Sequence, residues 1–141
     1  MIAGCSPAEA DAPVTTEAAQ ASELTEAMQN IGEQMLEAVD DRRIAELSED
    51  EFVRISLDLS ARMEEQRDRY EADEQQYKDA QELIDLFGVA YFGDQANEDD
   101  IFEASRDEMA VMLGEPTKYN QTESVWDLAK AYEEAWEANN P

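Results

Sequence analysis

The chain has 141 residues, of which 36 are acidic and 10 basic, so its net charge is −26, and it contains no histidine. Such a charge repels nucleic acid phosphates and attracts cationic partners, although an acidic surface can also serve simply to keep a protein hydrated in salt. Without histidine, the usual general base and most zinc, copper and haem ligands are missing, and one cysteine cannot form an internal disulfide. We therefore expect neither an enzyme nor a metal or cofactor site.

Residue usage predicts helices. Four prolines, five glycines and few β-branched residues argue against a β fold, and the length suits one domain. We expect an all-α fold, a helical hairpin or bundle of four to five helices with one long central helix. This domain is assigned to residues 21–141, and residues 1–20 are assigned to a disordered, flexible tether.

The first residues carry a short motif followed by a spacer. Ile2-Ala3-Gly4-Cys5 resembles the lipobox of bacterial lipoproteins, and the Pro/Ala/Thr/Glu stretch after it lacks helical periodicity. The resemblance implies that Cys5 is lipidated and that Ser6 directs the protein to the outer membrane, facing the periplasm. The charged and apolar parts of a signal peptide do not precede the motif, so we expect a trimmed chain or a true start further upstream. Without a signal peptide, the expected location is cytoplasmic.

The first helix is expected to begin between Thr16 and Ser22, with Ser22 as the better N-cap. Gly32 lies within this helix, where it would allow a second helix to approach closely, and a kink or break is expected around Asp41. Apolar residues follow heptad spacing along one face: Leu24, Met28, Ile31, Met35 and Val39.

The stretch Ser48–Phe92 carries the longest helical pattern. It opens with a capping box, Ser48-Glu49-Asp50-Glu51, and then repeats seam residues at alternating spacings of three and four. Its middle, Glu64–Gln76, has almost no aliphatic residues, and only Tyr70 marks the seam there. The stretch is therefore either one helix that crosses solvent or two helices that break near Ala72–Glu74. Oppositely charged residues at i,i+4 steps are expected to brace its solvent face: Asp50, Arg54, Asp58 and Arg62.

The segment Leu83–Phe92 is apolar on nearly all sides, which indicates burial. Gly93 is expected to end the helix, and Asp94–Asp100 to form an acidic loop. That loop does not fit an EF-hand, because its sixth position is Asp99 rather than glycine and its twelfth is Ser105 rather than glutamate.

Two further helices are expected. One runs from about Asp99 to Leu113 and is stopped by Gly114, and the other is capped by Ser124. The last helix carries three aromatic residues that are interpreted as core anchors, with an exposed recognition patch as the alternative: Trp126, Tyr132 and Trp136.

Together these features predict a non-enzymatic, lipid-anchored envelope protein that acts as a helical interaction or scaffold module. One alternative is an acidic protein that captures a cationic partner, as an inhibitor or immunity protein would. A second alternative, for a cytoplasmic chain, is a mimic of nucleic acid; binding to nucleic acid itself is not expected. The candidate interaction surface comprises the aromatic end of the long helical stretch, the acidic loop and the last helix: Tyr91, Phe92, Asp94, Asp99, Asp100, Trp126 and Trp136.

Overall fold

The computed structural model describes residues 24–69 and 74–140, and within these ranges it contains five helices and no strand. This confirms the all-α prediction. The motif with Cys5 and the whole of the proposed tether, residues 1–20, lie outside the described residues. The helices are α1 (Glu26–Arg43), α2 (Glu49–Arg69), α3 (Glu74–Ala96), α4 (Asp99–Leu113) and α5 (Val125–Asn139).

Helix α1 begins later than predicted. Its N-cap is Thr25, whose side-chain oxygen accepts the Met28 N–H at 3.1 Å, so the expected start between Thr16 and Ser22 is wrong. The predicted break near Asp41 corresponds to the end of the helix at Arg43.

The capping box at the start of α2 is confirmed. The Ser48 N–H donates to Glu51 Oε1 at 3.1 Å, and the Glu51 N–H donates to Ser48 Oγ at 3.2 Å. Of the charge ladder proposed for this helix, the described residues contain one i,i+4 ion pair, between Arg62 and Asp58 at 3.8 Å. The ladder therefore supports α2 less than expected.

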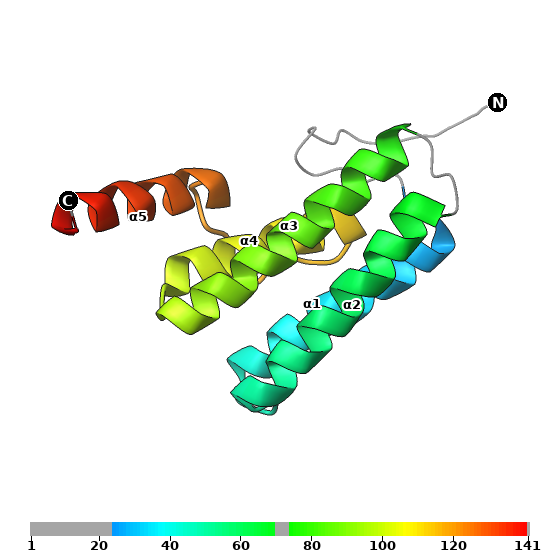
Figure 1. Cartoon of the computed structure of the whole chain (residues 1–141), viewed down its shortest axis with the longest axis horizontal. Helices are drawn as coiled ribbons and strands as arrows, with labels where there is room; N and C mark the ends of the chain where they lie inside the picture. The colour runs from blue at the N-terminus through cyan, green and yellow to red at the C-terminus, as the bar shows by residue number, and fades with distance from the viewer. Residues whose placement is uncertain (1–23, 70–73, 141) are drawn as a thin grey trace.

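The stretch Ser48–Phe92 forms two helices that pack against each other, rather than one continuous helix (Figure 1). Helices α2 and α3 run in opposite directions, with residues 70–73 outside the described ranges. The Phe52 ring of α2 meets the Phe87 ring of α3 edge to face, with ring centres 6.3 Å apart. Near the other end of the pair, the Arg67 guanidinium lies over the Tyr77 ring at 5.1 Å. The seam residues therefore face each other across a hairpin.

Helices α3 and α4 are in close backbone contact at Gly93. A side-chain carbon at this position would lie 2.8 Å from the backbone nitrogen of Phe102, so glycine is needed here. The sequence analysis expected Gly93 to end α3, and this is wrong, because the helix continues to Ala96. A two-residue turn at Asn97 and Glu98 then leads directly into α4. The expected acidic loop is consequently almost absent.

The core lies between α1, α2, α3 and α4. Gly32 of α1 is buried against the Leu113 side chain of α4, as its sequence position suggested. Helix α4 ends at Gly114, which has a left-handed conformation with φ 76° and confirms the predicted stop. Helix α5 lies to one side of the four-helix body (Figure 1).

Candidate functional site

Helix α5 is fixed to the body at its first turn. Ser124 Oγ accepts the Trp126 N–H at 3.1 Å, which confirms the predicted cap. Glu108 of α4 accepts the Val125 N–H through Oε2 at 2.7 Å. Burial raises the pKa of the Glu108 carboxyl, and this hydrogen bond offsets the rise only in part. The two oxygens satisfy N–H groups that a helix start leaves without intrahelical partners.

Beyond that turn, α5 contributes little to the core. Within the part of the chain that the structure describes, Val125 is the only buried residue of α5, and the helix packs mainly on α4. Leu128 and Tyr132 are partly buried against the core. The Tyr132 ring meets the Phe92 ring of α3 edge to face, with centres 5.2 Å apart.

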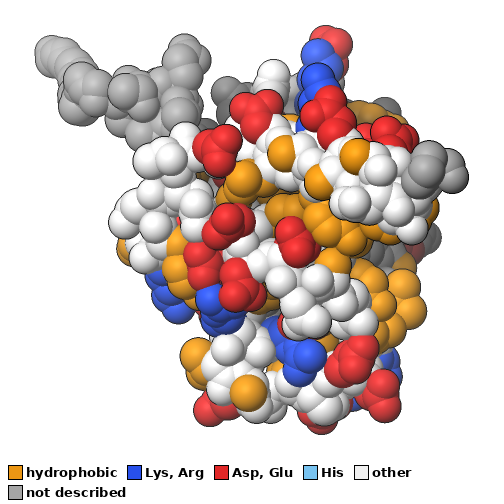
Figure 2. Space-filling view, turned by 90° about the vertical axis from the view of Figure 1, so that its left-hand side faces the viewer, with side chains coloured by type: hydrophobic (Ala, Val, Ile, Leu, Met, Phe, Trp, Pro, Cys, Tyr) orange, Lys and Arg blue, Asp and Glu red, His pale blue; other side chains and the backbone are white. Residues whose placement is uncertain are grey.

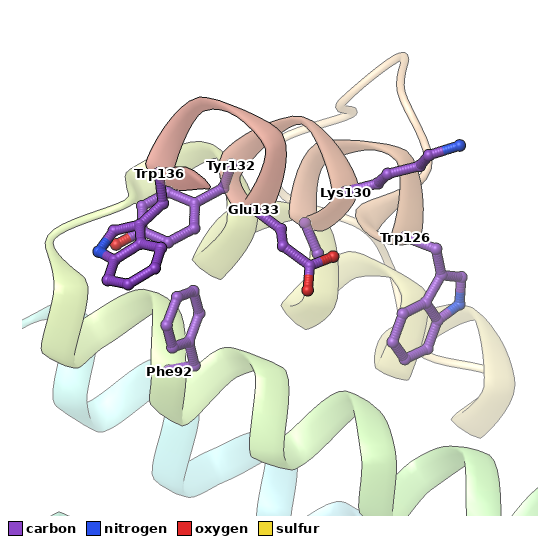
Figure 3. Close-up of a pocket in the computed structure, with 7 residues that line it drawn as sticks. Phe92, Trp126, Lys130, Tyr132, Glu133 and Trp136 are labelled. Carbon is purple, nitrogen blue, oxygen red and sulfur yellow. The ribbon is translucent and has the colours of Figure 1, made fainter. Parts of the chain in front are cut away.

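An apolar groove of about 640 Å³ runs along α5 (Figure 3). Figure 3 shows Phe92 pointing from α3 towards Tyr132 and Trp136, while Trp126 lies at the other end of the groove. The exposed fractions of Phe92, Trp126 and Trp136 are 39%, 43% and 55%. Ala129, Lys130 and Glu133 complete the lining.

A second groove, of about 530 Å³, also borders α5. Tyr132 and Trp136 contribute to both grooves, and Glu98 and Asp100 add acidic side chains to the second. The grooves therefore share an aromatic edge, so that much of the apolar surface of α5 is available to a partner.

The interpretation of the tryptophans as core anchors was wrong, because both indoles are exposed. Val125 and Leu128 direct α5 onto α4, and successive helical residues are turned by about 100°. Trp126 follows Val125 directly, so it does not share the buried face of Val125 and lies in the lining of the groove instead. Trp136 lies near the far end of the helix, at the outer edge of the Phe92–Tyr132 contact.

The remaining candidate residues separate into different environments. The Tyr91 ring packs on Phe52 with ring centres 6.0 Å apart, so it belongs to the α2–α3 hairpin rather than to the groove. Asp94 accepts Arg42 Nε through both oxygens at 3.1 Å, and Asp99 lies 3.2 Å from Arg43 Nη1. These pairs join the end of α1 to the α3–α4 turn. Asp94, whose side chain is largely buried, is therefore a structural residue, whereas Asp99 and Asp100 are both exposed and Asp100 lies beside the second groove.

A charged cluster that the sequence analysis missed supports the approach to α5. The guanidinium of Arg106, 3% exposed, donates to both Asp40 oxygens at 2.9 and 3.2 Å and to Asp107 Oδ1 at 3.1 Å. It also donates to the Pro116 carbonyl oxygen at 2.9 Å. The available signal was the Arg106-Asp107 pair between apolar residues on α4, which indicates buried and paired charges.

Asp107 in turn holds the segment that leads to α5. Its two oxygens accept the backbone N–H groups of Lys118, Tyr119 and Asn120 at 2.9, 2.8 and 2.7 Å. Burial alone would raise the pKa of Asp107, but these hydrogen bonds and the Arg106 guanidinium lower it below its ordinary value. Because Arg106 makes four hydrogen bonds within the fold and both Asp107 oxygens are also engaged there, the cluster suits positioning rather than catalysis.

The described residues contain no group of three or more His, Cys, Asp or Glu side chains arranged to hold a metal ion. Among the same residues, no helix combines the length and apolar character needed to cross a membrane. The feature that stands out chemically is thus the aromatic groove beside α5.

Comparison of the chain with models of protein families, with curated proteins and with solved structures found no match.

Proposed function

We propose that the protein is a non-enzymatic helical interaction module that binds a protein partner through the groove along α5. The observation that carries the proposal is the exposure of Phe92, Trp126 and Trp136 beside one apolar groove. Contiguous exposed aromatic surface is costly in water and is typical of binding sites. Tryptophan and tyrosine are also enriched among the residues that dominate binding energy at protein interfaces.

Local rigidity supports the same proposal. The Glu108 and Ser124 hydrogen bonds hold the first turn of α5, and Asp107 holds the preceding segment. A site on a held helix loses less conformational entropy on binding than a site on a free segment. The four-helix body would then serve as the platform that presents α5.

We further propose that Cys5 anchors this module to the outer membrane by a lipid, on the periplasmic side of the envelope. Support comes from the Ile2-Ala3-Gly4-Cys5 motif and the spacer after it. If the gene is expressed with the sequence that precedes it, Cys5 should incorporate an alkyne-labelled fatty acid, and Cys5→Ser should not. Failure to incorporate the label would favour a cytoplasmic protein, for which the nucleic-acid-mimic alternative remains.

Site-specific photocrosslinking tests the interaction. A photoreactive amino acid is placed at Trp136 in the groove or, as a control, at Leu57, a more accessible apolar position on α2 that is 70% exposed. In the organism that carries the gene, position 136 should yield a discrete crosslinked protein that position 57 does not. The product should disappear when Phe92→Ala removes the opposite wall of the groove. Equal products at both positions, or none at position 136, would refute the proposed site.

A further inference from the structure

The surroundings of the groove are acidic. Among the described residues that line it, Lys130 is the one basic residue, while α5 alone carries four acidic residues: Asp127, Glu133, Glu134 and Glu137. Figure 2 shows the end of the molecule that carries the C-terminus, where acidic side chains lie around exposed hydrophobic ones. The site therefore combines an apolar floor with an anionic rim.

We propose that the occupant of this groove is a cationic amphipathic helix of a protein partner. This inference rests on the proposed function and adds the chemistry of the partner. An apolar helix face would lie on Phe92, Tyr132 and the two indoles, and Lys or Arg side chains along its edges would meet the acidic rim. Helices bind grooves in this way through anchors spaced at i, i+3, i+4 and i+7.

The length of the groove suits such a helix. Trp126 and Trp136 are ten residues apart on α5, which corresponds to about 15 Å along the helix axis at 1.5 Å per residue. That distance equals nearly three helical turns of a partner lying alongside. Two to three anchor side chains can therefore reach the groove at once.

Charge argues against the two occupants that the chain itself could supply. Residues 1–23 contain four acidic residues, no basic residue and no aromatic residue, so they lack both features that the site would recognise. A second copy of the chain would bring another net charge of −26 and the same acidic α5. Like charges placed opposite each other oppose both of these associations.

The chain offers a specific optical probe, because Trp126 and Trp136 are its only tryptophans and both line the groove. The full chain is titrated with three synthetic tryptophan-free peptides of about 18 residues, or roughly 27 Å of helix. The first has a leucine face and a lysine face, the second replaces each lysine with glutamine, and the third is a scrambled lysine/leucine sequence without helical periodicity. The first should shift the emission to shorter wavelength at a 1:1 ratio, with a Kd at least about tenfold below those of the others.

Matched charge variants locate the electrostatic contribution. E133Q/E137Q changes Glu133, which lines the groove, and Glu137, which lies one helical turn further along the same face of α5. E46Q/E64Q changes exposed residues of the α1–α2 turn and α2, and each pair raises the net charge by two. We expect the first pair to weaken binding of the lysine peptide by about fivefold or more and the second by less than about twofold. Phe92→Ala, with helix content confirmed by circular dichroism, should weaken it by at least about tenfold.

Each contrary result overturns the inference in a distinguishable way. Equal binding of the glutamine peptide would keep the groove as a docking site but remove the requirement for a cationic partner. Equal binding of the scrambled peptide, with equal effects of both double variants, would show diffuse attraction to an acidic surface. Concentration-dependent dimerisation that competes with the peptide would identify a second copy as the occupant. No fluorescence change with any peptide would reject the cationic helix, while the crosslinks at position 136 would still decide the proposed function.

Discussion

Asp107 connects the buried interior of the protein to the orientation of its exposed helix. One carboxylate accepts three consecutive backbone N–H groups, from Lys118, Tyr119 and Asn120, and also pairs with Arg106. Such a residue stabilises a segment that has few apolar contacts of its own. The aspartate side chain is short, and it reaches these N–H groups because α4 places it directly beneath that segment.

Replacing this carboxylate with an amide should therefore be costly. We expect Asp107→Asn to lower the free energy of unfolding by about 2–4 kcal/mol, because it leaves Arg106 short of a counter-charge and the N–H groups with a weaker acceptor. Asp100→Asn, an exposed change on the same helix, should cost less than about 1 kcal/mol. Urea denaturation of both variants measures the difference, and equal costs would contradict the assigned role.

The difference in stability between the wild type and Asp107→Asn should also depend on pH. Since the pKa of Asp107 is lowered in the folded state, its contribution is fully present above the ordinary pKa of an aspartate. That contribution is lost as the pH falls through the lowered folded-state value. The stability difference between the wild type and Asp107→Asn should accordingly be constant near neutral pH and shrink only in strong acid.

At the scale of the elements, the close contact of α3 and α4 at Gly93 determines how the site is assembled. The two-residue turn after α3 brings α4 back along α3, and Gly93 lets the backbones of these two helices come into close contact. Phe92 precedes this contact and projects towards α5. The position of the aromatic groove thus depends on a glycine that does not line it.

Two glycines of α3 provide a matched test. In Gly93→Ala the new carbon would lie 2.8 Å from the Phe102 nitrogen, so the helices must separate, and we expect a loss of about 1–3 kcal/mol. In Gly88→Ala nothing lies within 4 Å, and the better helix propensity of alanine should stabilise the protein by about 0.5–1 kcal/mol. Thermal or urea unfolding compares the two. Stabilisation by both changes would show that α3 and α4 are not in close contact at Gly93.

For the whole molecule, the net charge of −26 acts against compactness, because the acidic side chains repel one another more strongly when the chain folds. Glu82 illustrates the local effect: burial and the neighbouring Glu108 charge both raise the pKa of its carboxyl. Dissolved ions weaken such repulsion over distances set by the Debye length.

Salt should consequently stabilise the protein. Raising NaCl from about 0.01 M to about 1 M shortens the Debye length from about 30 Å to about 3 Å, and the melting temperature should rise by several degrees. KCl should act equally, because screening does not distinguish the two cations. MgCl2 at equal ionic strength serves as the comparison, since a much larger effect of the divalent ion would indicate a specific cation site instead. A melting temperature that does not change with salt would contradict the repulsion argument.

Much of the local structure followed from short-range rules. Ser48 and Glu51 satisfy each other's backbone N–H groups within one turn, Ser124 caps its own helix, and Gly114 adopts the left-handed conformation that ends α4. These interactions involve residues at most four positions apart, so the sequence alone suffices to predict them. Lipidation at Cys5 stays a prediction, because the motif lies outside the described residues.

The sequence by itself therefore determined the all-α class, the starts of α2 and α5, both ends of α4 and the acidic character of the surface. Only the tertiary structure decided that Ser48–Phe92 folds as a hairpin, that Arg106 is buried with Asp40, and that Trp126 and Trp136 face solvent. An apolar pattern predicts that a side chain favours burial, but it does not predict which other part of the fold will cover that side chain. On α5 the body covers Val125 and leaves the indoles open, because the helix packs mainly on α4.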